Sequence, residues 1–215
     1  MDFFLKVLAA YLLGSVVGSL VVGRLRGGVD IRTQGSGNAG ATNAVRTQGW
    51  RFAIWVIVID VLKGVIAAVL IPRIAVPGVA PTLPPLAAWL PAACAFAAIV
   101  GHVFPVWSGF RGGKGVATLV GAYAGIDVFL LLPLVCAWFG MVVVSGYVGF
   151  ASIVASLAVA AYLLIRDGGA LTPTLGFALA CAALVIWTHR GNVRRMRAGV
   201  EPRARKLWLF GRGRS

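Results

Sequence analysis

The sequence predicts an all-α protein that crosses a membrane several times. Hydrophobic residues make up 60% of the 215 residues and charged residues only 12%, against about 25% charged residues in soluble globular chains. The mean hydropathy is +0.91, and the apolar residues form runs near the roughly 20 residues that one helical crossing requires. We therefore expect a polytopic integral membrane protein that forms one domain over residues 1–215.

Five apolar runs supply the expected spans. Four of them have about the length of one crossing, at residues 3–22, 52–71, 83–103 and 171–187. We expect the first to be a retained span and not a signal peptide, because Asp2 precedes it and a basic segment is missing. The fifth run, residues 116–165, is interrupted at Asp127 and at residues 145–147, so its length fits two spans or three.

Charge decides between two spans and three. The 20 basic residues outnumber the 6 acidic ones, and most of them lie in the first loop or in the tail after His189. Loops rich in Lys and Arg stay in the cytoplasm, so both regions face the same side and residues 116–165 cross an odd number of times. Three short spans there bring the total to seven, with the N-terminus outside and the C-terminus cytoplasmic. The basic tail at residues 203–215 is expected to lie against anionic headgroups.

Three polar stretches reach the cytoplasmic face in this topology: the first (residues 35–46), the second (residues 101–118) and the third (residues 189–205). Each combines glycine and hydroxyl or amide groups with Arg or Lys, and only the third contains an acid, Glu201. Donor groups without carboxylates indicate an anion site, and above all a site for phosphate.

The first polar stretch, GSGNAGATNAVR, offers the most candidate ligands. Its glycines allow successive N–H groups to point into one concavity, which binds anions. Hydroxyls, amides and a guanidinium add donors, and the guanidinium can bind a phosphate through two nitrogens. The alternative is a flexible cytoplasmic turn. The phosphate-binding residues that we expect here are Gly35, Ser36, Gly37, Asn38, Gly40, Thr42, Asn43 and Arg46.

The second polar stretch contains Gly112, Gly113 and Lys114 directly before an apolar run. It does not complete a nucleotide-binding P-loop, because Ser108 takes the place of the first glycine and Gly115 that of the Ser or Thr. Backbone N–H groups and an ammonium at a helix start still favour an anion. We expect Gly112, Gly113 and Lys114 to bind phosphate. The alternative is that Lys114 only anchors the end of the span.

The third polar stretch places His189 and Asn192 three residues apart, on one face of a helix. His189 can donate to a phosphate or accept a proton, whereas juxtamembrane anchoring alone explains the nearby arginines. His102, at the end of an earlier span, is either a structural or a catalytic histidine. Asp60 and Lys63 lie mid-span at a spacing that lets them pair, and they either link helices or form a proton or ion path.

The acidic residues and cysteines exclude several kinds of chemistry. No two acids cluster near the polar stretches, which argues against a two-carboxylate mechanism or a metal site. Neither histidine has an Asp five residues later, so the His-x4-Asp signature of CoA-dependent and carrier-dependent acyltransferases is missing. We expect no metal, no cofactor and an already activated donor. Cys94, Cys136 and Cys181 lie in apolar runs and are expected to be buried structural thiols.

These motifs resemble the PlsY family, the bacterial membrane glycerol-3-phosphate acyltransferases that use acyl phosphate. The family's Gly-Ser-Gly-Asn-x-Gly-Ala-Thr-Asn-x-x-Arg matches residues 35–46. Its Gly-His-x-Phe-Pro and Phe-Lys-Gly-Gly-Lys-Gly-Val-Ala-Thr match residues 101–118, with Arg111 in place of the first lysine. Its Asp-x-Leu-Lys-Gly matches residues 60–64, and its His-Arg-x-Asn-Ile-x-Arg matches residues 189–195 with Val193 for Ile. Two further residues depart from the family pattern: Gly191, where Glu is usual, and Gly149, where Ser is frequent.

The resemblance implies seven spans and a complete reaction. The sn-1 hydroxyl of glycerol 3-phosphate attacks an acyl phosphate and gives lysophosphatidic acid and phosphate, the first step of phospholipid synthesis. The active site then faces the cytoplasm from the bacterial plasma (inner) membrane, among membrane lipids, with neither a metal nor coenzyme A and with no nucleic acid partner. The catalytic residues expected on this basis are Ser36, Lys114, His189 and Asn192.

Two other functions fit parts of the sequence. A transporter of phosphorylated metabolites also needs Arg, Lys and glycine loops. It is expected to have polar groups at the midplane and a two-halved repeat, whereas the polar residues here gather at one face. A non-catalytic lipid-binding relative would explain Gly149 and Gly191.

Overall fold

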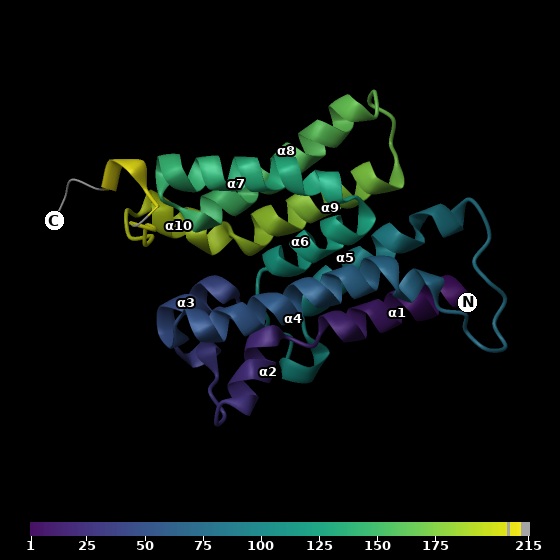
Figure 1. Cartoon of the computed structure of the whole chain (residues 1–215), viewed down its shortest axis with the longest axis horizontal. Helices are drawn as coiled ribbons and strands as arrows, with labels where there is room; N and C mark the ends of the chain where they lie inside the picture. The colour runs from purple at the N-terminus through teal and green to yellow at the C-terminus, as the bar shows by residue number, and fades with distance from the viewer. Residues whose placement is uncertain (206, 212–215) are drawn as a thin grey trace. The chain divides into compact units, whose positions relative to one another are not determined.

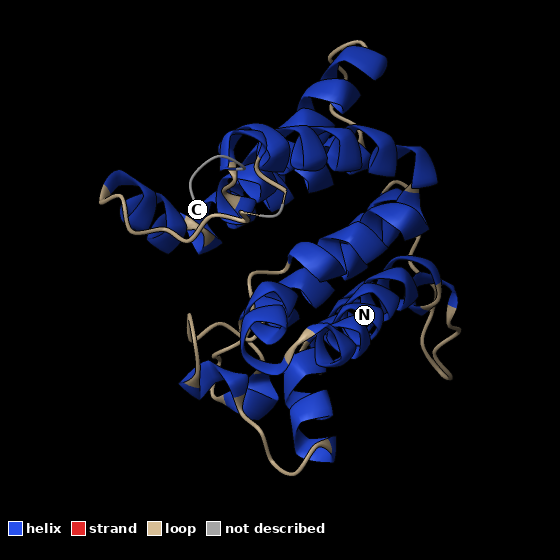
Figure 2. Ribbon diagram, turned by 60° about the vertical axis from the view of Figure 1, so that its left-hand side comes forward, coloured by secondary structure: helices blue, strands red, loops and turns tan. Residues whose placement is uncertain are grey.

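The computed structural model describes residues 1–205 and 207–211, and every regular element within them is a helix (Figures 1 and 2). The chain forms two compact units, Met1–Asp127 and Val128–Ser215. The all-α prediction is confirmed, and the single domain over residues 1–215 stays a prediction. Within the predicted tail at residues 203–215, Lys206 and residues 212–215 lie outside the described residues.

The first unit contains six α-helices and four 3-10 turns. The helices are α1 (Asp2–Gly14), α2 (Gly18–Leu25), α3 (Ala41–Gln48), α4 (Trp50–Val69), α5 (Leu90–Val103) and α6 (Val116–Ile126). The turns are η1 (Ile31–Thr33), η2 (Ile71–Arg73), η3 (Leu86–Trp89) and η4 (Val106–Ser108). α1 and α2 form one bent pair, with an angle of 46° between them.

Small residues let the helices of the first unit approach closely. α4 packs against α6, and α1 packs against α5 (Figure 1). A Cβ atom added at Gly64 would overlap the Thr118 carbonyl, and one added at Gly101 would overlap the Tyr11 carbonyl. Because lipid supplies no hydrophobic force between membrane helices, close backbone packing at such glycines is what holds the helices together.

The second unit consists of η5 (Val128–Leu130), α7 (Leu131–Ser145), α8 (Val148–Arg166), α9 (Pro173–Thr188), α10 (Arg190–Arg197) and η6 (Leu209–Gly211). The turn from α7 to α8 requires Gly146, whose φ of +74° lies in the left-handed region. α9 starts where the Thr172 side chain accepts the Leu175 N–H at 3.1 Å, with Pro173 as its first residue. α7 packs against α8, and α8 packs against α9.

The long apolar run at residues 116–165 forms three helices, α6, α7 and α8, with the breaks at Asp127 and at residues 146–147. In the described part of the chain, four helical segments are long and apolar enough to cross a membrane. The number rises to six if each bent pair, α1–α2 and α9–α10, is one span. α6 has only 11 residues, so the total of seven spans and the orientation of the termini stay predictions.

The prediction of buried cysteines is correct for Cys94 and Cys181 and wrong for Cys136, which is exposed on α7. The physical reason is that α7 turns an apolar face outward, where Leu132 and Phe139 are exposed as well. Lipid tails are as apolar as leucine side chains, so an apolar run in a membrane helix does not by itself indicate which face is buried.

Candidate active site

The first polar stretch is a structured loop that leads into α3. Asn43, a buried residue of α3, holds the loop in shape. Its Oδ1 accepts the N–H of Ser36 at 2.9 Å, and its Nδ2 donates to the carbonyls of Ile31 and Gln34 at 2.9 and 3.0 Å. A Cβ atom at Gly35, whose φ is +56°, would overlap the Asn43 amide. Asn43 therefore shapes the loop, and its contact with phosphate stays a prediction.

Several hydrogen-bond donors of this loop lie exposed around the start of α3. Asn38 Oδ1 accepts the N–H of Gly40 at 2.9 Å, and Gly40 is the N-cap of α3. The first N–H groups of a helix have no partner within it. The side chains of Ser36 and Thr42 are exposed nearby, and that of Arg46 is exposed in the last turn of α3. An exposed helix start beside hydroxyl groups is able to bind phosphoryl oxygens.

The glycine turn of the second polar stretch, residues 112–115, is held by the end of α5. The Gly113 N–H donates to the His102 carbonyl at 3.1 Å. A Cβ atom at Gly112 would overlap that carbonyl, and one at Gly113 would overlap His102 Nε2, so neither position accepts a side chain as the loop stands. Lys114 is half-buried and lies two residues before the start of α6. The turn therefore places an ammonium group beside a helix start.

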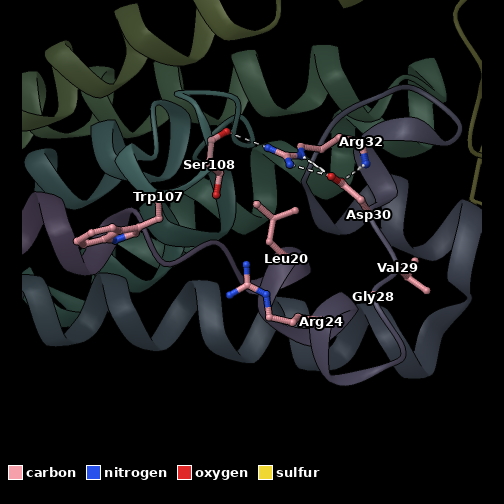
Figure 3. Close-up of a pocket in the computed structure, with 8 residues that line it drawn as sticks. All are labelled: Leu20, Arg24, Gly28, Val29, Asp30, Arg32, Trp107 and Ser108. Carbon is pink, nitrogen blue, oxygen red and sulfur yellow. Dashed lines mark hydrogen bonds and ion pairs between the residues drawn. The ribbon is translucent and has the colours of Figure 1, made fainter.

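Arg32, just before the first polar stretch, connects it with the second, a contact that the sequence analysis missed. Its Nε and Nη2 atoms bind the Asp30 carboxylate at 2.7 to 3.1 Å. Its Nη1 donates to the carbonyls of Ser108 and Arg111, each at 3.0 Å. Figure 3 shows Arg32 between Asp30 and Ser108 at the edge of a cavity of about 210 Å³. The sequence held one sign of this arrangement, because Asp30, whose carboxylate binds Arg32, is the only acid in residues 24–51.

The side-chain hydrogen bond from Arg32 lowers the pKa of Asp30 below its ordinary value. The folded protein then binds this proton less readily than the unfolded chain does. The pair therefore stabilises the fold above the unfolded pKa of roughly 4, and this contribution is lost as the pH falls through the folded pKa. We expect Asp30→Asn to be less stable than the wild type at pH 7 and to lose less stability on acidification. Thermal unfolding in detergent from pH 7 to pH 3 measures this, and parallel curves for the two proteins would contradict it.

The predicted pairing of Asp60 with Lys63 is confirmed. Lys63 Nζ lies 2.9 Å from Asp60 Oδ1 and donates to the carbonyls of Gly14 and Val16 at 2.9 and 2.8 Å. Since these carbonyls lie where α1 ends, the pair links helices, which is one of the two roles considered. His102 Nδ1 lies 2.9 Å from Lys63 Nζ, so the imidazole bonds to this ammonium. Asp60, Lys63 and His102 are called the Lys63 cluster below.

In the second unit, His189 is buried at the junction of α9 and α10. Its Nδ1 lies 2.8 Å from the Val185 carbonyl oxygen. A carbonyl only accepts hydrogen bonds, so in the neutral ring Nδ1 carries the proton and Nε2 carries the lone pair. This tautomer makes Nε2 the atom that can accept a proton.

Asn192 is held by Glu201, the acid of the third polar stretch. Asn192 Nδ2 donates to Glu201 Oε1 at 2.6 Å, and Arg195 Nε donates to Oε2 at 2.6 Å. A Cβ atom at Gly149 would lie 2.7 Å from Asn192 Nδ2, so the absence of a side chain at Gly149 leaves room for Asn192. Nothing in the structure explains Gly191, where an added Cβ atom would meet only Arg195 at 3.6 Å.

The predicted site residues thus fall into two groups. Within the first unit, Arg32 brings the first and second polar stretches together. The predicted residues of this unit are Gly35, Ser36, Gly37, Asn38, Gly40, Thr42, Asn43, Arg46, Gly112, Gly113 and Lys114, and those of the second unit are His189 and Asn192.

Apolar helices that can span a membrane, together with two acid-poor glycine loops beside helix starts, define a helical membrane protein with a candidate anion site. The family model for glycerol-3-phosphate acyltransferase matches residues 4–199. The chain belongs to this family, as the resemblance to PlsY had indicated, and it is a membrane acyltransferase. Membership of an enzyme family decides against the transporter considered above.

Similar proteins cover nearly the whole chain. A glycerol-3-phosphate acyltransferase of Thioalkalivibrio sulfidiphilus is 40% identical over 197 residues, which span 92% of this chain and 91% of the relative. One from Coxiella burnetii is 36% identical, spanning 95% of this chain and 100% of the relative. The crystal structure of PlsY, an integral membrane glycerol 3-phosphate acyltransferase, in its glycerol 3-phosphate form has a TM-score of 0.80 and 34% identity. It covers 94% of this chain and 96% of PlsY. The lysophosphatidic acid form of PlsY gives a TM-score of 0.79 and 33% identity.

Proposed function

We propose that this enzyme transfers a fatty acyl group from an acyl phosphate to the sn-1 hydroxyl of glycerol 3-phosphate. The hydroxyl oxygen forms a bond to the acyl carbon, and the bond from that carbon to the phosphate oxygen breaks. The hydroxyl proton passes to the departing phosphate. The products are lysophosphatidic acid and inorganic phosphate, so all atoms are accounted for.

The observation that carries this proposal is the pairing of two glycine loops in one unit. The Arg32 side chain, three residues before the first loop, donates to two carbonyls of the second polar stretch. Each loop leads into a helix start, with Lys114 two residues before α6 and Arg46 in the last turn of α3. Such helix starts bind phosphoryl groups, and both substrates of the proposed reaction carry one. The similarity to PlsY structures in glycerol 3-phosphate and lysophosphatidic acid forms supports the same assignment.

An acyl phosphate is a reactive mixed anhydride, so positioning and charge stabilisation are sufficient for catalysis. The catalytic residues of this proposal are the four that the family resemblance implies: Ser36, Lys114, His189 and Asn192. The remaining residues of the two glycine loops bind substrate phosphate. The acyl chain lies among membrane lipids, and neither a metal ion nor coenzyme A takes part.

The test uses purified protein in detergent with palmitoyl phosphate and glycerol 3-phosphate, in the presence of EDTA. We expect release of one phosphate for each lysophosphatidic acid formed. A parallel reaction with palmitoyl-CoA in place of palmitoyl phosphate is the control for the donor. Product from palmitoyl-CoA alone would overturn the proposed donor, and no product from either donor with folded protein would overturn the proposed reaction.

Arg46→Ala is expected mainly to raise KM, by about tenfold, since a bidentate contact to a phosphate contributes to ground state and transition state alike. Steady-state kinetics with each substrate varied in turn measures the effect. Arg26, a basic residue before the first polar stretch, supplies the control variant Arg26→Ala. A fall in kcat larger than the rise in KM would show that Arg46 acts in the transition state.

We further propose seven spans in the bacterial plasma membrane, with both the first and the third polar stretch in the cytoplasm. Single cysteines at Asn38 and Val200 test this in a Cys136→Ser background, because Cys94 and Cys181 are buried. Inside-out membrane vesicles exposed to an impermeant maleimide are expected to label both positions, and right-side-out vesicles to label neither. Labelling of the two positions from opposite sides would contradict the topology.

A further inference from the structure

Three buried ionisable side chains lie inside the first unit and have no place in the proposed reaction. Asp60, Lys63 and His102, the Lys63 cluster, are 1%, 3% and 2% exposed. Charged groups are costly in the apolar part of a membrane protein and persist there when they have partners and a task. The arrangement of their partners indicates what that task is.

Hydrogen bonds fix the His102 ring in one orientation. Its Nδ1 lies 2.9 Å from Lys63 Nζ and 3.3 Å from Asp60 Oδ1. An ammonium group only donates, so the shorter contact makes Nδ1 the acceptor and places the ring proton on Nε2. Lys63 is held in turn by Asp60 and by the two carbonyls at the end of α1, so the ring cannot turn without breaking this set of bonds.

The fixed ring supports the glycine turn of the second polar stretch. The Gly113 N–H donates to the backbone carbonyl of His102, and a Cβ atom at Gly113 would overlap Nε2 of the same residue. His102 therefore contacts Gly113 through both its backbone and its ring. The place of this turn, and with it the place of Lys114, depends on where the ring lies.

The other end of the Lys63 cluster reaches the first polar stretch. Asp60 Oδ1 accepts the N–H of Gly18, the first residue of α2, at 3.0 Å. The next residue, Ser19, donates its hydroxyl to the carbonyl of Ala39 at 2.7 Å. Ala39 lies inside the first polar stretch, so two hydrogen bonds separate the buried carboxylate from that loop.

We propose that the Lys63 cluster is a common platform that positions both glycine loops of the enzyme. In this account His102 is a positioning residue for Lys114 and has no contact with substrate. The inference rests on the proposed function only in that it takes the two loops to bind phosphate. It predicts that the fit between His102 and Gly113, and not the charge of His102, is what catalysis requires.

A suppressor experiment tests this fit. Gly113→Ala is expected to lower kcat/KM by about 10- to 100-fold, because the new methyl group displaces the turn from the ring. His102→Asn keeps an acceptor for Lys63 in the Oδ1 atom and removes the ring edge that faces Gly113. The double variant is therefore expected to regain activity over Gly113→Ala alone and to come within about threefold of His102→Asn.

The control glycine is Gly140 in α7, where an added Cβ atom meets no atom within 4 Å. Gly140→Ala is expected to leave activity unchanged, both in the wild type and in the His102→Asn variant. Thermal unfolding of every variant identifies one that has merely lost its fold, and His102→Gln, a second ring deletion, replaces His102→Asn in that case. A double variant no more active than Gly113→Ala, with both proteins folded, would overturn the platform.

The platform proposal and the proposed function can fail independently of each other. If the wild type makes no product from palmitoyl phosphate, the donor assignment fails. Calorimetric titration of the same variants with glycerol 3-phosphate still tests the platform. Weakened binding by Gly113→Ala and recovery in the double variant would support it, and equal binding by all variants would overturn it.

Discussion

Replacing Lys114 by alanine is expected to lower kcat by about 10²- to 10³-fold, the usual effect of removing one preorganised donor to developing charge. In the proposed reaction, negative charge increases on the departing phosphate as the acyl–oxygen bond breaks. Lys114 lies two residues before the start of α6, where the helix dipole also favours negative charge. Steady-state kinetics with palmitoyl phosphate and glycerol 3-phosphate measures the loss.

Arg111 supplies the matched control for Lys114. It lies three residues earlier in the same stretch with an exposed side chain, and Arg32 bonds to its backbone carbonyl, which an alanine keeps. We expect Arg111→Ala to change kcat by no more than about threefold, as for a screened surface charge. Equal losses for the two variants would mean that the net charge of the stretch matters and that Lys114 has no special place in it.

Replacing Lys63 by methionine is expected to destabilise the protein by about 3–5 kcal/mol, because it leaves the Asp60 carboxylate buried without its cation. The same change removes the donor that Lys63 supplies to the carbonyls of Gly14 and Val16 and to His102. Such a loss is a large fraction of the stability of a typical domain, about 5–15 kcal/mol. Thermal unfolding in detergent and the yield of folded protein both measure it.

The double variant Asp60→Leu, Lys63→Met distinguishes the cost of burying an unpaired carboxylate from the cost of losing the side-chain contacts of Lys63. Replacement of a buried ion pair by apolar groups is often neutral for stability, whereas removal of one partner is not. We expect the double variant to be more stable than Lys63→Met while its activity stays low, since the platform for the loops is lost. A Lys63→Met protein as stable as the wild type would contradict the charge argument.

Most of the helices were predictable because their signal is local. Runs of apolar residues of the length of a span indicate helices wherever the surroundings are lipid. Asp127 and Gly146 interrupt residues 116–165 at the two places where the chain leaves the helix. The outward face of α7, with Cys136, was not predictable, since it depends on which neighbours the helix contacts.

The candidate site was predictable only in part, because only its local features are visible in the sequence. Glycines, hydroxyls and cations at 35–46 and 112–114 are visible in the sequence, and so is their lack of acids. The contact from Arg32 to Ser108 joins residues 76 positions apart, and that from Lys63 to His102 joins residues 39 apart. Such contacts follow from helix packing and leave no local pattern. Asn43 shows the converse, because its amide holds its own loop, a role that the sequence does not indicate, while its contact with phosphate stays a prediction.

Calorimetric titration with glycerol 3-phosphate measures whether the glycine loops of the first unit bind a phosphoryl group. We expect the wild type to bind glycerol 3-phosphate and not glycerol, with an affinity that falls as salt screens the loop cations. Lys114→Ala or Arg46→Ala should weaken this binding by about tenfold, as expected for loss of one charge-assisted contact to phosphate. Binding of glycerol 3-phosphate that neither variant weakens and that salt leaves unchanged would contradict phosphoryl binding by these loops.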